Sequence, residues 1–471
     1  MTPPTRLLLL GAGRSASSLL RYLLAHAPAE RWFITVADAQ PAHLAPVLAA
    51  HSQFARAVPL DVQHEAQLTE LVEEADIVIS MLPASFHGAV ARACLALGRH
   101  LATASYVSAE LRALHEPAAA AGLVFLMECG LDPGLDHMSA MQAIERIKAR
   151  GGRLTAFASY CGGLLDPASE GDNPWRYKFT WNPRNVVLAG QGGAASYLEN
   201  GHLRLVPYQR LFAQPSQLRV PGVGELEGYP NRDSLSYRAP YGLADIPSII
   251  RGTLRRPGYC GAWQALVGLG LTDDTTRLPA AGAPRTWAAL VAGLLPAAPA
   301  ESTDKQAKSE AATALAVRAA AYLRLDPHGP EMTRLVWLGL FENHPLGRAE
   351  ATLAELLEHR LAEKWQLQPH DRDLIVLQHQ FTYQLDEQAR RLTSSLAVTG
   401  DDATHTAMAK TVGLPLGMAV RRLARGLVAA RGVVIPTAAE LYEPILAELA
   451  ADYGIAFTEE EHEVSLTSQT T

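Results

Sequence analysis

The sequence predicts an α/β fold, and three observations support this prediction. Over residues 1–132, short apolar runs alternate with helical stretches, which is typical of a parallel sheet with helices on both faces. From about Gly130 to Arg256, the chain becomes dense in glycine, proline, aromatic residues and arginine. Residues 278–325 are rich in alanine and leucine at helical spacing. We therefore expect a doubly wound N-terminal domain, a mixed α/β second domain and a helical insert, with the polar run 302–306 as an exposed entry into one helix.

The first domain is expected to alternate short strands with helices. These strands are expected at 7–10, 33–37, 57–60, 77–81, 100–102 and 124–127. Helices are expected between them, at 17–24, 64–73 and 87–97. Further along, 372–381 is expected to be a strand, and 408–425 a helix whose small residues allow close packing.

The four leucines at 7–10 lead directly into the pattern Gly-x-Gly-x-x-Ala. Gly11 permits a tight turn, Gly13 lets the backbone approach a pyrophosphate, and Ala16 lets the helix pack closely on the strand. The helix N-terminus favours the phosphate charge. This order of strand, turn and helix predicts a Rossmann dinucleotide-binding domain, with Arg14 and Ser15 also beside the cofactor.

An acidic residue, Asp38, ends the second expected strand. A carboxylate there can accept hydrogen bonds from the ribose hydroxyls and repels a 2′-phosphate, so it favours NAD, with NADP still possible. The alternative is an ordinary acidic turn at the end of this strand.

The ends of the third and fourth strands are expected to line the crevice in which the dinucleotide lies. The residues expected there are Asp61, Val62, Ser80, Met81, Leu82 and Pro83.

Composition argues against several other classes of protein. The net charge of −7 gives no support to nucleic-acid binding, and no lysine or arginine run indicates an anionic membrane surface. No apolar run approaches the length of a membrane span. Four widely spaced cysteines without a Cys-x-x-Cys motif predict free thiols in a reducing cytoplasm and indicate no metal site.

Several segments in the right order resemble the saccharopine dehydrogenase family, in particular its glutamate-forming subgroup. The signature is Glu-Cys-Gly-Leu-Asp-Pro-Gly-Leu-Asp-His at 128–137. The similarity runs from the first strand to about Phe457 and is weakest near 275–330. The other matching segments lie at 159–164, 177–181, 229–234, 250–255, 411–415, 435–437 and 441–444.

The resemblance implies an oxidoreductase of lysine metabolism that interconverts saccharopine and the pair glutamate plus 2-aminoadipate 6-semialdehyde. It also implies a homodimer. Two other functions stay open. One is reduction of a related imine, as in a carboxynorspermidine dehydrogenase. The other is a dinucleotide-binding regulator without catalysis, against which the intact glycine turn and the filled substrate positions argue.

The resemblance also implies the substrate-binding residues. Saccharopine carries three carboxylates, and the two-pronged guanidinium of arginine suits a carboxylate. Arg232 and Arg255 match family positions that bind saccharopine, while Arg251 is a weaker candidate. The other matching positions are Thr253 and Leu254. Cys161, in a glycine-rich segment, is a further candidate as a thiol in the substrate wall, with no partnered histidine that would make it a nucleophile.

Ser105, Tyr106 and Asp132 match positions where substrate and cofactor meet in the family. Asp132 is expected to hold the substrate amine or pass a proton, with Tyr106 beside it, although Asp132 can instead cap the helix that begins near Leu135. Leu131 and Pro133 are expected to contact the cofactor. His137 and Lys178 are weaker acid–base candidates, because packing is the more common role for a histidine at the start of an apolar helix and for a lysine flanked by aromatic residues.

One position departs from the family. Members that use NADP tend to carry a basic residue near the end of the second strand, where this chain has Asp38-Ala39-Gln40-Pro41.

The expected domains are a Rossmann domain at 1–132 joined by a returning segment near 405–430, a substrate and dimerisation domain at 133–275, 330–404 and 431–457, and a helical insert at 276–329.

Overall fold

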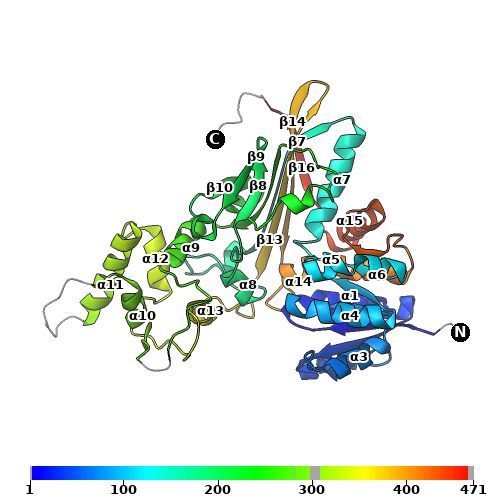
Figure 1. Ribbon diagram of the computed structural model, residues 1–471, viewed down its shortest axis with the longest axis horizontal. Coiled ribbons are helices and arrows are strands. Elements are labelled where there is room, and N and C mark those ends of the chain that lie inside the picture. The colour runs from blue at the N-terminus through cyan, green and yellow to red at the C-terminus, as the bar shows by residue number, and fades with distance from the viewer. Residues whose placement is uncertain (1–2, 280–281, 298–307, 465–471) are drawn as a thin grey trace. The chain divides into compact units, whose positions relative to one another are not determined.

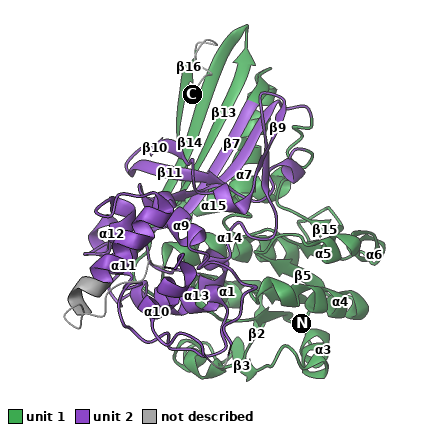
Figure 2. Ribbon diagram, turned by 60° about the vertical axis from the view of Figure 1, so that its left-hand side comes forward, with its two compact units in different colours: residues 1–155, 239–244, 372–471 green, residues 156–238, 245–371 purple. Residues whose placement is uncertain are grey.

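The computed structural model describes residues 3–279, 282–297 and 308–464, so the polar run 302–306 lies outside the described residues. The chain forms two compact units, which Figure 2 shows in separate colours. Unit 1 contains residues 1–155, 239–244 and 372–471, and unit 2 contains residues 156–238 and 245–371.

Unit 1 contains a parallel sheet of seven strands in the order β15-β6-β5-β4-β1-β2-β3. Figure 1 colours the chain from blue at the N-terminus to red at the C-terminus, so the first six of these strands along the chain lie in its blue to cyan part. β2 and β3 lie on one side of β1, whereas β4, β5 and β6 lie on the other side. The strand order therefore reverses between β1 and β4. Ligands bind outside the carboxyl ends of the strands at such a reversal. The strands are β1 (Thr5–Leu10), β2 (Trp32–Asp38), β3 (Ala55–Pro59), β4 (Ile77–Ser80), β5 (His100–Thr103), β6 (Val124–Leu126) and β15 (Gly432–Val434).

The helices of unit 1 include one that comes from far along the chain. In α14 (Ala407–Ala424), Gly413 lies so close to α1 (Ser17–Glu30) that an added Cβ would be 2.6 Å from the backbone nitrogen of Leu19. A glycine therefore allows the two helices to meet. The other helices of this unit are α2 (Ala45–Ala49), α3 (Glu65–Glu73), α4 (His87–Leu97), α5 (Ala109–Ala113), α6 (His115–Ala120), α7 (Leu135–Ala149) and α15 (Ala439–Tyr453).

Unit 1 also holds three antiparallel strands: β13 (Asp373–Leu385), β14 (Gln388–Thr399) and β16 (Thr458–Glu463). The β13–β14 hairpin turns at Asp386 and Glu387, which both have positive φ. Asp373, at the start of β13, is fully buried and accepts hydrogen bonds from the Ala407 and Met408 amides. It thereby satisfies two free N–H groups at the first turn of α14.

Unit 2 is built on a mixed sheet. β12 (Ser248–Arg255) pairs with β11 (Gly224–Pro230) on one side and runs parallel to β7 (Arg153–Leu165) on the other. β10 (Ser216–Val220) extends the sheet beyond β11. The remaining strands form the hairpin of β8 (Ala195–Glu199) and β9 (His202–Val206).

The helices of unit 2 enclose a large aromatic core. Trp175, Trp263, Trp287 and Trp365 are all almost completely buried in it. Because Trp287 lies in α10 (Trp287–Leu294) and Ala319 of α11 (Lys308–Leu323) is also buried there, the alanine-rich segment shares this core. The other helices are α8 (Pro183–Val187), α9 (Tyr259–Gly268), α12 (Pro330–Trp337) and α13 (Leu353–Lys364).

The six strands predicted in the first domain are confirmed, with ends that differ by at most two residues. β15 was not expected from the sequence; it has three residues and pairs with β6 some 300 positions earlier. Among the described residues, no helix is both long and apolar enough to cross a bilayer.

Candidate functional site

The two glycines of the turn after β1 differ in whether the fold itself requires a glycine. Gly11 has φ +85°, and an added Cβ would be 3.2 Å from the carbonyl oxygen of Met81, so the fold itself requires glycine there. Gly13 has φ −70°, and an added Cβ would meet no atom within 4 Å. The chain therefore has room for a side chain at Gly13 but leaves the space open.

That open space lies where a pyrophosphate would approach the backbone, so the turn fits a dinucleotide. Arg14, Ser15 and Ala16 form a short 3-10 turn that leads into α1. Ala16 is buried, as close packing of helix and strand requires. The predicted cofactor positions therefore have the geometry that phosphate binding needs.

Asp38 lies at the carboxyl end of β2 and contacts the glycine turn. One carboxylate oxygen accepts a hydrogen bond from the Ala12 amide (2.8 Å), and the other accepts one from the Gln40 amide (2.9 Å). His43 contacts the carbonyl oxygens of Gln40 (2.7 Å) and Ala12 (3.2 Å). The carboxylate is thus fixed beside the turn, where the ribose of a dinucleotide would lie.

The other predicted cofactor residues follow the ends of neighbouring strands. Asp61 follows β3 and accepts a hydrogen bond from the Gln63 amide (3.0 Å). Met81 follows β4 and donates its amide to the Leu10 carbonyl (2.8 Å), which keeps the ends of β1 and β4 together. The remaining residues of these two ends are Val62, Ser80, Leu82 and Pro83.

The loop after β5 carries Ser105 and Tyr106. The Ser105 hydroxyl contacts Nε2 of His87 (2.7 Å), and Nδ1 of His87 contacts the Ser80 hydroxyl (2.9 Å). His87 is 1 % exposed, and this burial lowers the pKa of its imidazole from 6.5 to about 4. A neutral imidazole therefore links the ends of β4 and β5.

Tyr106 and Asp132 meet directly. The Tyr106 hydroxyl donates a 2.7 Å hydrogen bond to a carboxylate oxygen of Asp132, so the structure brings these two predicted residues together. Asp132 lies half-buried in a tight turn, in which Gly130 donates its amide to the Pro133 carbonyl (3.0 Å). At Gly134, which has φ +144°, an added Cβ would be 2.3 Å from Gly130, so this turn requires glycine.

The alternative role of Asp132 as a helix cap is not observed. The residue at the N-cap of α7 is Gly134, with no side-chain capping bond. The carboxylate that accepts the Gly134 amide (2.7 Å) belongs to Asp136. Leu131 and Pro133, on either side of Asp132, are both buried.

The two weaker acid–base candidates have close partners within their own units. Lys178 forms a 2.6 Å ion pair with Asp371, which is 3 % exposed and also accepts the Gln368 amide. His137 is fully buried and contacts Glu128 (2.8 Å) and the hydroxyl of Tyr241 (2.5 Å). Glu128 and Tyr241 were not among the residues expected at the site, although Glu128 is an acidic residue directly after an apolar run.

Arg255 is the most unusual of the predicted substrate residues. Its side chain is 4 % exposed, and its guanidinium carbon lies 5.0, 5.2 and 5.8 Å from the ring centres of Tyr177, Tyr259 and Tyr229. Nη1 donates to the Leu254 carbonyl (2.8 Å), whereas Nε has no hydrogen-bond partner. In the described part of the chain, no carboxylate forms an ion pair with Arg255. A buried cation of this kind calls for an anion.

The other predicted substrate residues of unit 2 differ in exposure. Thr253 lies opposite Cys161 in the pairing of β12 with β7, and the Cys161 thiol is buried. Leu254 is fully buried. Arg232 is exposed, and its amide contacts the side chain of Asn231 (2.8 Å). Arg251 is buried over the ring of Tyr237, at 4.1 Å from its centre.

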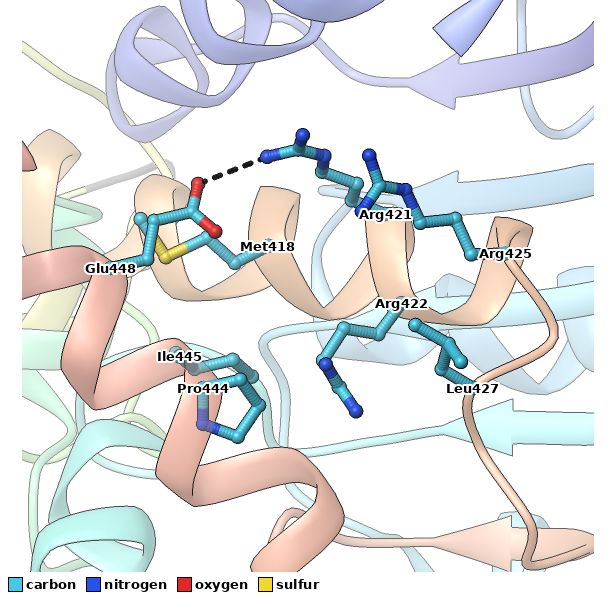
Figure 3. Close-up of a pocket in the computed structure, with 8 residues that line it drawn as sticks. All are labelled: Met418, Arg421, Arg422, Arg425, Leu427, Pro444, Ile445 and Glu448. Atoms are coloured by element: carbon cyan, nitrogen blue, oxygen red, sulfur yellow. Dashed lines mark hydrogen bonds and ion pairs between the residues drawn. The ribbon is translucent and has the colours of Figure 1, made fainter.

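A small cavity between α14 and α15 holds a cluster of charges (Figure 3). Its volume is about 50 Å³, which is far too small for a dinucleotide or an amino acid such as saccharopine. Arg421 bridges Glu448 (3.5 Å) and Glu30 of α1 (2.7 Å), and Arg425 also pairs with Glu30. These ion pairs join three helices, and we assign them a structural role. Among the described residues, no group of three or more His, Cys, Asp or Glu side chains is arranged to hold a metal ion.

Two family models together match nearly all of the chain. The Saccharopine dehydrogenase NADP binding domain matches residues 7–126, and the Saccharopine dehydrogenase C-terminal domain matches residues 130–455. The chain is 35% identical over 421 residues to the saccharopine dehydrogenase (NADP(+), L-glutamate-forming) of Pyricularia oryzae, covering 87% of this chain and 89% of that relative. It is 34% identical to the alpha-aminoadipic semialdehyde synthase of Arabidopsis thaliana, but it spans only 45% of that longer protein.

Solved structures agree with these matches. The apo saccharopine dehydrogenase (L-Glu forming) of Saccharomyces cerevisiae superposes with a TM-score of 0.83 at 30% identity, covering 97% of this chain and all of that one. The homospermidine synthase of Legionella pneumophila has a TM-score of 0.54 at 10% identity and shares the fold alone.

Proposed function

The chain belongs to the saccharopine dehydrogenase family, and is therefore an oxidoreductase with a nicotinamide cofactor, and we propose that it interconverts saccharopine with L-glutamate and 2-aminoadipate 6-semialdehyde. The single observation that carries this proposal is Arg255. A buried guanidinium without an acidic partner among the described residues suits a substrate that brings its own carboxylates.

In the proposed reaction, saccharopine, oxidised nicotinamide and water give glutamate, the semialdehyde, reduced nicotinamide and a proton. A bound nicotinamide would supply hydride exchange with the methylene carbon of saccharopine that is bonded to the secondary amine and becomes the aldehyde carbon of the semialdehyde. The carbon–nitrogen bond then breaks by addition of water to the resulting substrate imine, and the amine leaves with glutamate.

We propose that residues of the chain act by binding and orientation. Arg232 and Arg255 hold substrate carboxylates through charge-assisted hydrogen bonds. Asp132, held by the Tyr106 hydroxyl, positions the substrate amine, with Ser105 beside it. The substrate amine is itself basic and exchanges protons with water, so the reaction does not require a dedicated protein base.

We further propose that the cofactor is NAD, in contrast to the NADP in the names of the relatives. The support for this proposal is the fixed carboxylate of Asp38 beside the glycine turn, which would face a 2′-phosphate with a like charge. Gly11, Gly13 and the 14–16 turn would hold the pyrophosphate of either cofactor. The homodimer and the cytoplasmic location expected from the sequence stay predictions.

A direct assay tests the proposed reaction. Purified protein, saccharopine and either oxidised cofactor should give reduced nicotinamide, followed by its absorbance, together with one glutamate for each reduced cofactor. Carboxynorspermidine is the matched control substrate, because it tests the alternative imine reaction. No turnover of saccharopine with either cofactor, in either direction, would refute the proposal.

A further inference from the structure

The loop that carries Tyr106 is attached to one residue by two hydrogen bonds. The Glu128 amide donates to the carbonyl of Ser105 (3.1 Å), and a carboxylate oxygen of Glu128 accepts the amide of Val107 (2.9 Å). These contacts lie on either side of Tyr106, whose hydroxyl donates to Asp132. Glu128 therefore fixes the backbone on both sides of a predicted site residue.

Glu128 has a backbone conformation that favours glycine. Its φ is +58°, in the left-handed region that L residues with a side chain rarely adopt. It is also 4 % exposed, so its carboxylate is buried, which is unfavourable without partners. A glutamate at a position whose backbone suits glycine indicates that the contacts of its side chain are needed there.

A second set of contacts holds the Glu128 side chain. Its other carboxylate oxygen lies 2.8 Å from Nε2 of His137, and Nδ1 of His137 lies 2.5 Å from the Tyr241 hydroxyl. One neutral tautomer satisfies both contacts: the Tyr241 hydroxyl donates to Nδ1, and the Nε2–H donates to Glu128. Glu128 is buried, and His137 and Tyr241 are completely so. The carboxylate is thus fixed in the orientation that reaches Val107.

We propose that Glu128 is a positioning residue, which acts through Val107 to hold Tyr106 against Asp132, with His137 and Tyr241 fixing its carboxylate. This inference rests on the proposed function, because it assigns the contact to the geometry of that reaction. Small displacements of a positioning group reduce the rate strongly, by as much as about a hundredfold for 1 Å.

The test uses two substitutions of Glu128 in the full-length protein. Glu128→Gly removes the carboxylate and relieves the backbone conformation, so the variant is expected to fold. We expect kcat/KM for saccharopine to fall by at least about tenfold, mainly in kcat, with an unchanged Kd for the nucleotide. Glu128→Gln should stay within about threefold of wild type, because an amide keeps both contacts if His137 changes its tautomer. Glu116→Gln, on the exposed face of α6, is the matched control and should be unchanged.

A double-mutant cycle with Tyr106→Phe separates positioning from general stability. If Glu128 acts through Tyr106, then Glu128→Gly should cost less than about threefold in the Tyr106→Phe background. An equal loss in both backgrounds would overturn the proposal, as would wild-type kinetics of the folded glycine variant. If that variant does not fold, Glu128→Asp, whose shorter side chain does not reach Val107, replaces it under the same criteria. An inactive wild type would instead count against the proposed function.

Discussion

Asp38 has a carboxylate that is already engaged by two backbone amides at the glycine turn. Its position is therefore fixed, and a 2′-phosphate cannot displace it without breaking both bonds. We predict that wild type has a higher kcat/KM with NAD than with NADP. The double change Asp38→Ser with Ala39→Arg should shift the ratio toward NADP by at least about tenfold, since a like-charge contact costs several kcal/mol. Ala39→Arg alone is the control and should shift it less. A wild type that already prefers NADP would show that Asp38 does not select the cofactor.

The buried His87 makes a prediction about stability and pH. Burial lowers the pKa of its imidazole from 6.5 to about 4, so between these values the unfolded chain binds a proton that the folded chain does not. Stability therefore falls as the pH decreases through 6.5, and this loss ends near pH 4. Between pH 7.5 and pH 5, the contribution is about 2 kcal/mol.

Urea unfolding of wild type and His87→Gln at both pH values measures this contribution. Wild type should lose about 2 kcal/mol more than the variant over the interval. His100, whose pKa is also lowered by burial, titrates in both proteins and cancels in the difference. An equal loss in the two proteins would mean that His87 is already protonated in the fold or is hydrated.

For single residues, the sequence indicated which residue types belong to the site, but it did not indicate which partners they contact. The glycine pattern placed Gly11 and Gly13 correctly in the turn after β1. Nothing in the sequence indicated that Lys178 pairs with Asp371, since the two are 193 positions apart. Partners at this separation depend on the whole fold, so sequence periodicity carries no signal of them.

Helices α1 and α14 show how a single glycine decides whether two elements meet. An added methyl group at Gly413 would be 2.6 Å from the Leu19 backbone nitrogen and 3.1 Å from its Cβ, and a backbone atom cannot move away cheaply. Gly413→Ala gains about 1 kcal/mol of helix propensity but loses about 1–3 kcal/mol to overpacking. We predict net destabilisation, seen as a lower midpoint of thermal unfolding.

The matched control is Gly293→Ala in α10. Gly293 is exposed and helical, and an added Cβ would meet no atom within 4 Å. This variant should be neutral or up to about 1 kcal/mol more stable. If both alanine variants are equally stable, α14 does not lie as close to α1 as the structure places it.

Elements were predictable where local periodicity was strong. The strands of residues 1–132 and the helix α14 follow from apolar runs and from helical spacing of small residues. β15 has only three residues, and β16 reads Thr-Glu-Glu-Glu-His-Glu, with every residue exposed. β16 is a strand because β14 pairs with it, which is a tertiary effect that composition opposes.

The division of the whole molecule into two units also cannot be predicted from local amino-acid composition. The segment 239–244 belongs to unit 1 although the chain on both sides of it belongs to unit 2. Six residues are too few to carry a compositional signal. Two contacts that tie them to unit 1 are that of Tyr241 with His137, 104 positions away, and the hydrogen bond that Lys148 donates to the Gly242 carbonyl (3.1 Å). The domain boundaries expected from the sequence therefore stay predictions.

The division places the glycine turn in unit 1 and Arg255 in unit 2, and this separation gives the last prediction. Arg255→Met keeps an unbranched side chain among the three tyrosines but removes the cation. Loss of a buried, charge-assisted contact with a substrate carboxylate should cost roughly 2–4 kcal/mol, or about 30- to 1000-fold in kcat/KM for saccharopine. Arg232→Ala should lower kcat/KM in the same direction. Arg204→Ala is the control, because Arg204 is an exposed arginine of the same unit that pairs with Glu199 (2.7 Å).

Nucleotide binding should be unaffected in all three variants, since none of them changes unit 1. Isothermal titration should give the wild-type Kd, and nucleotide should raise the thermal midpoint of every variant to the same extent, because a ligand that binds only the folded state stabilises it by mass action. The carboxylate-binding assignment is wrong if Arg255→Met retains wild-type kcat/KM. If nucleotide affinity falls together with kcat/KM, Arg255 instead supports the fold of the whole chain, and its guanidinium is not a substrate contact.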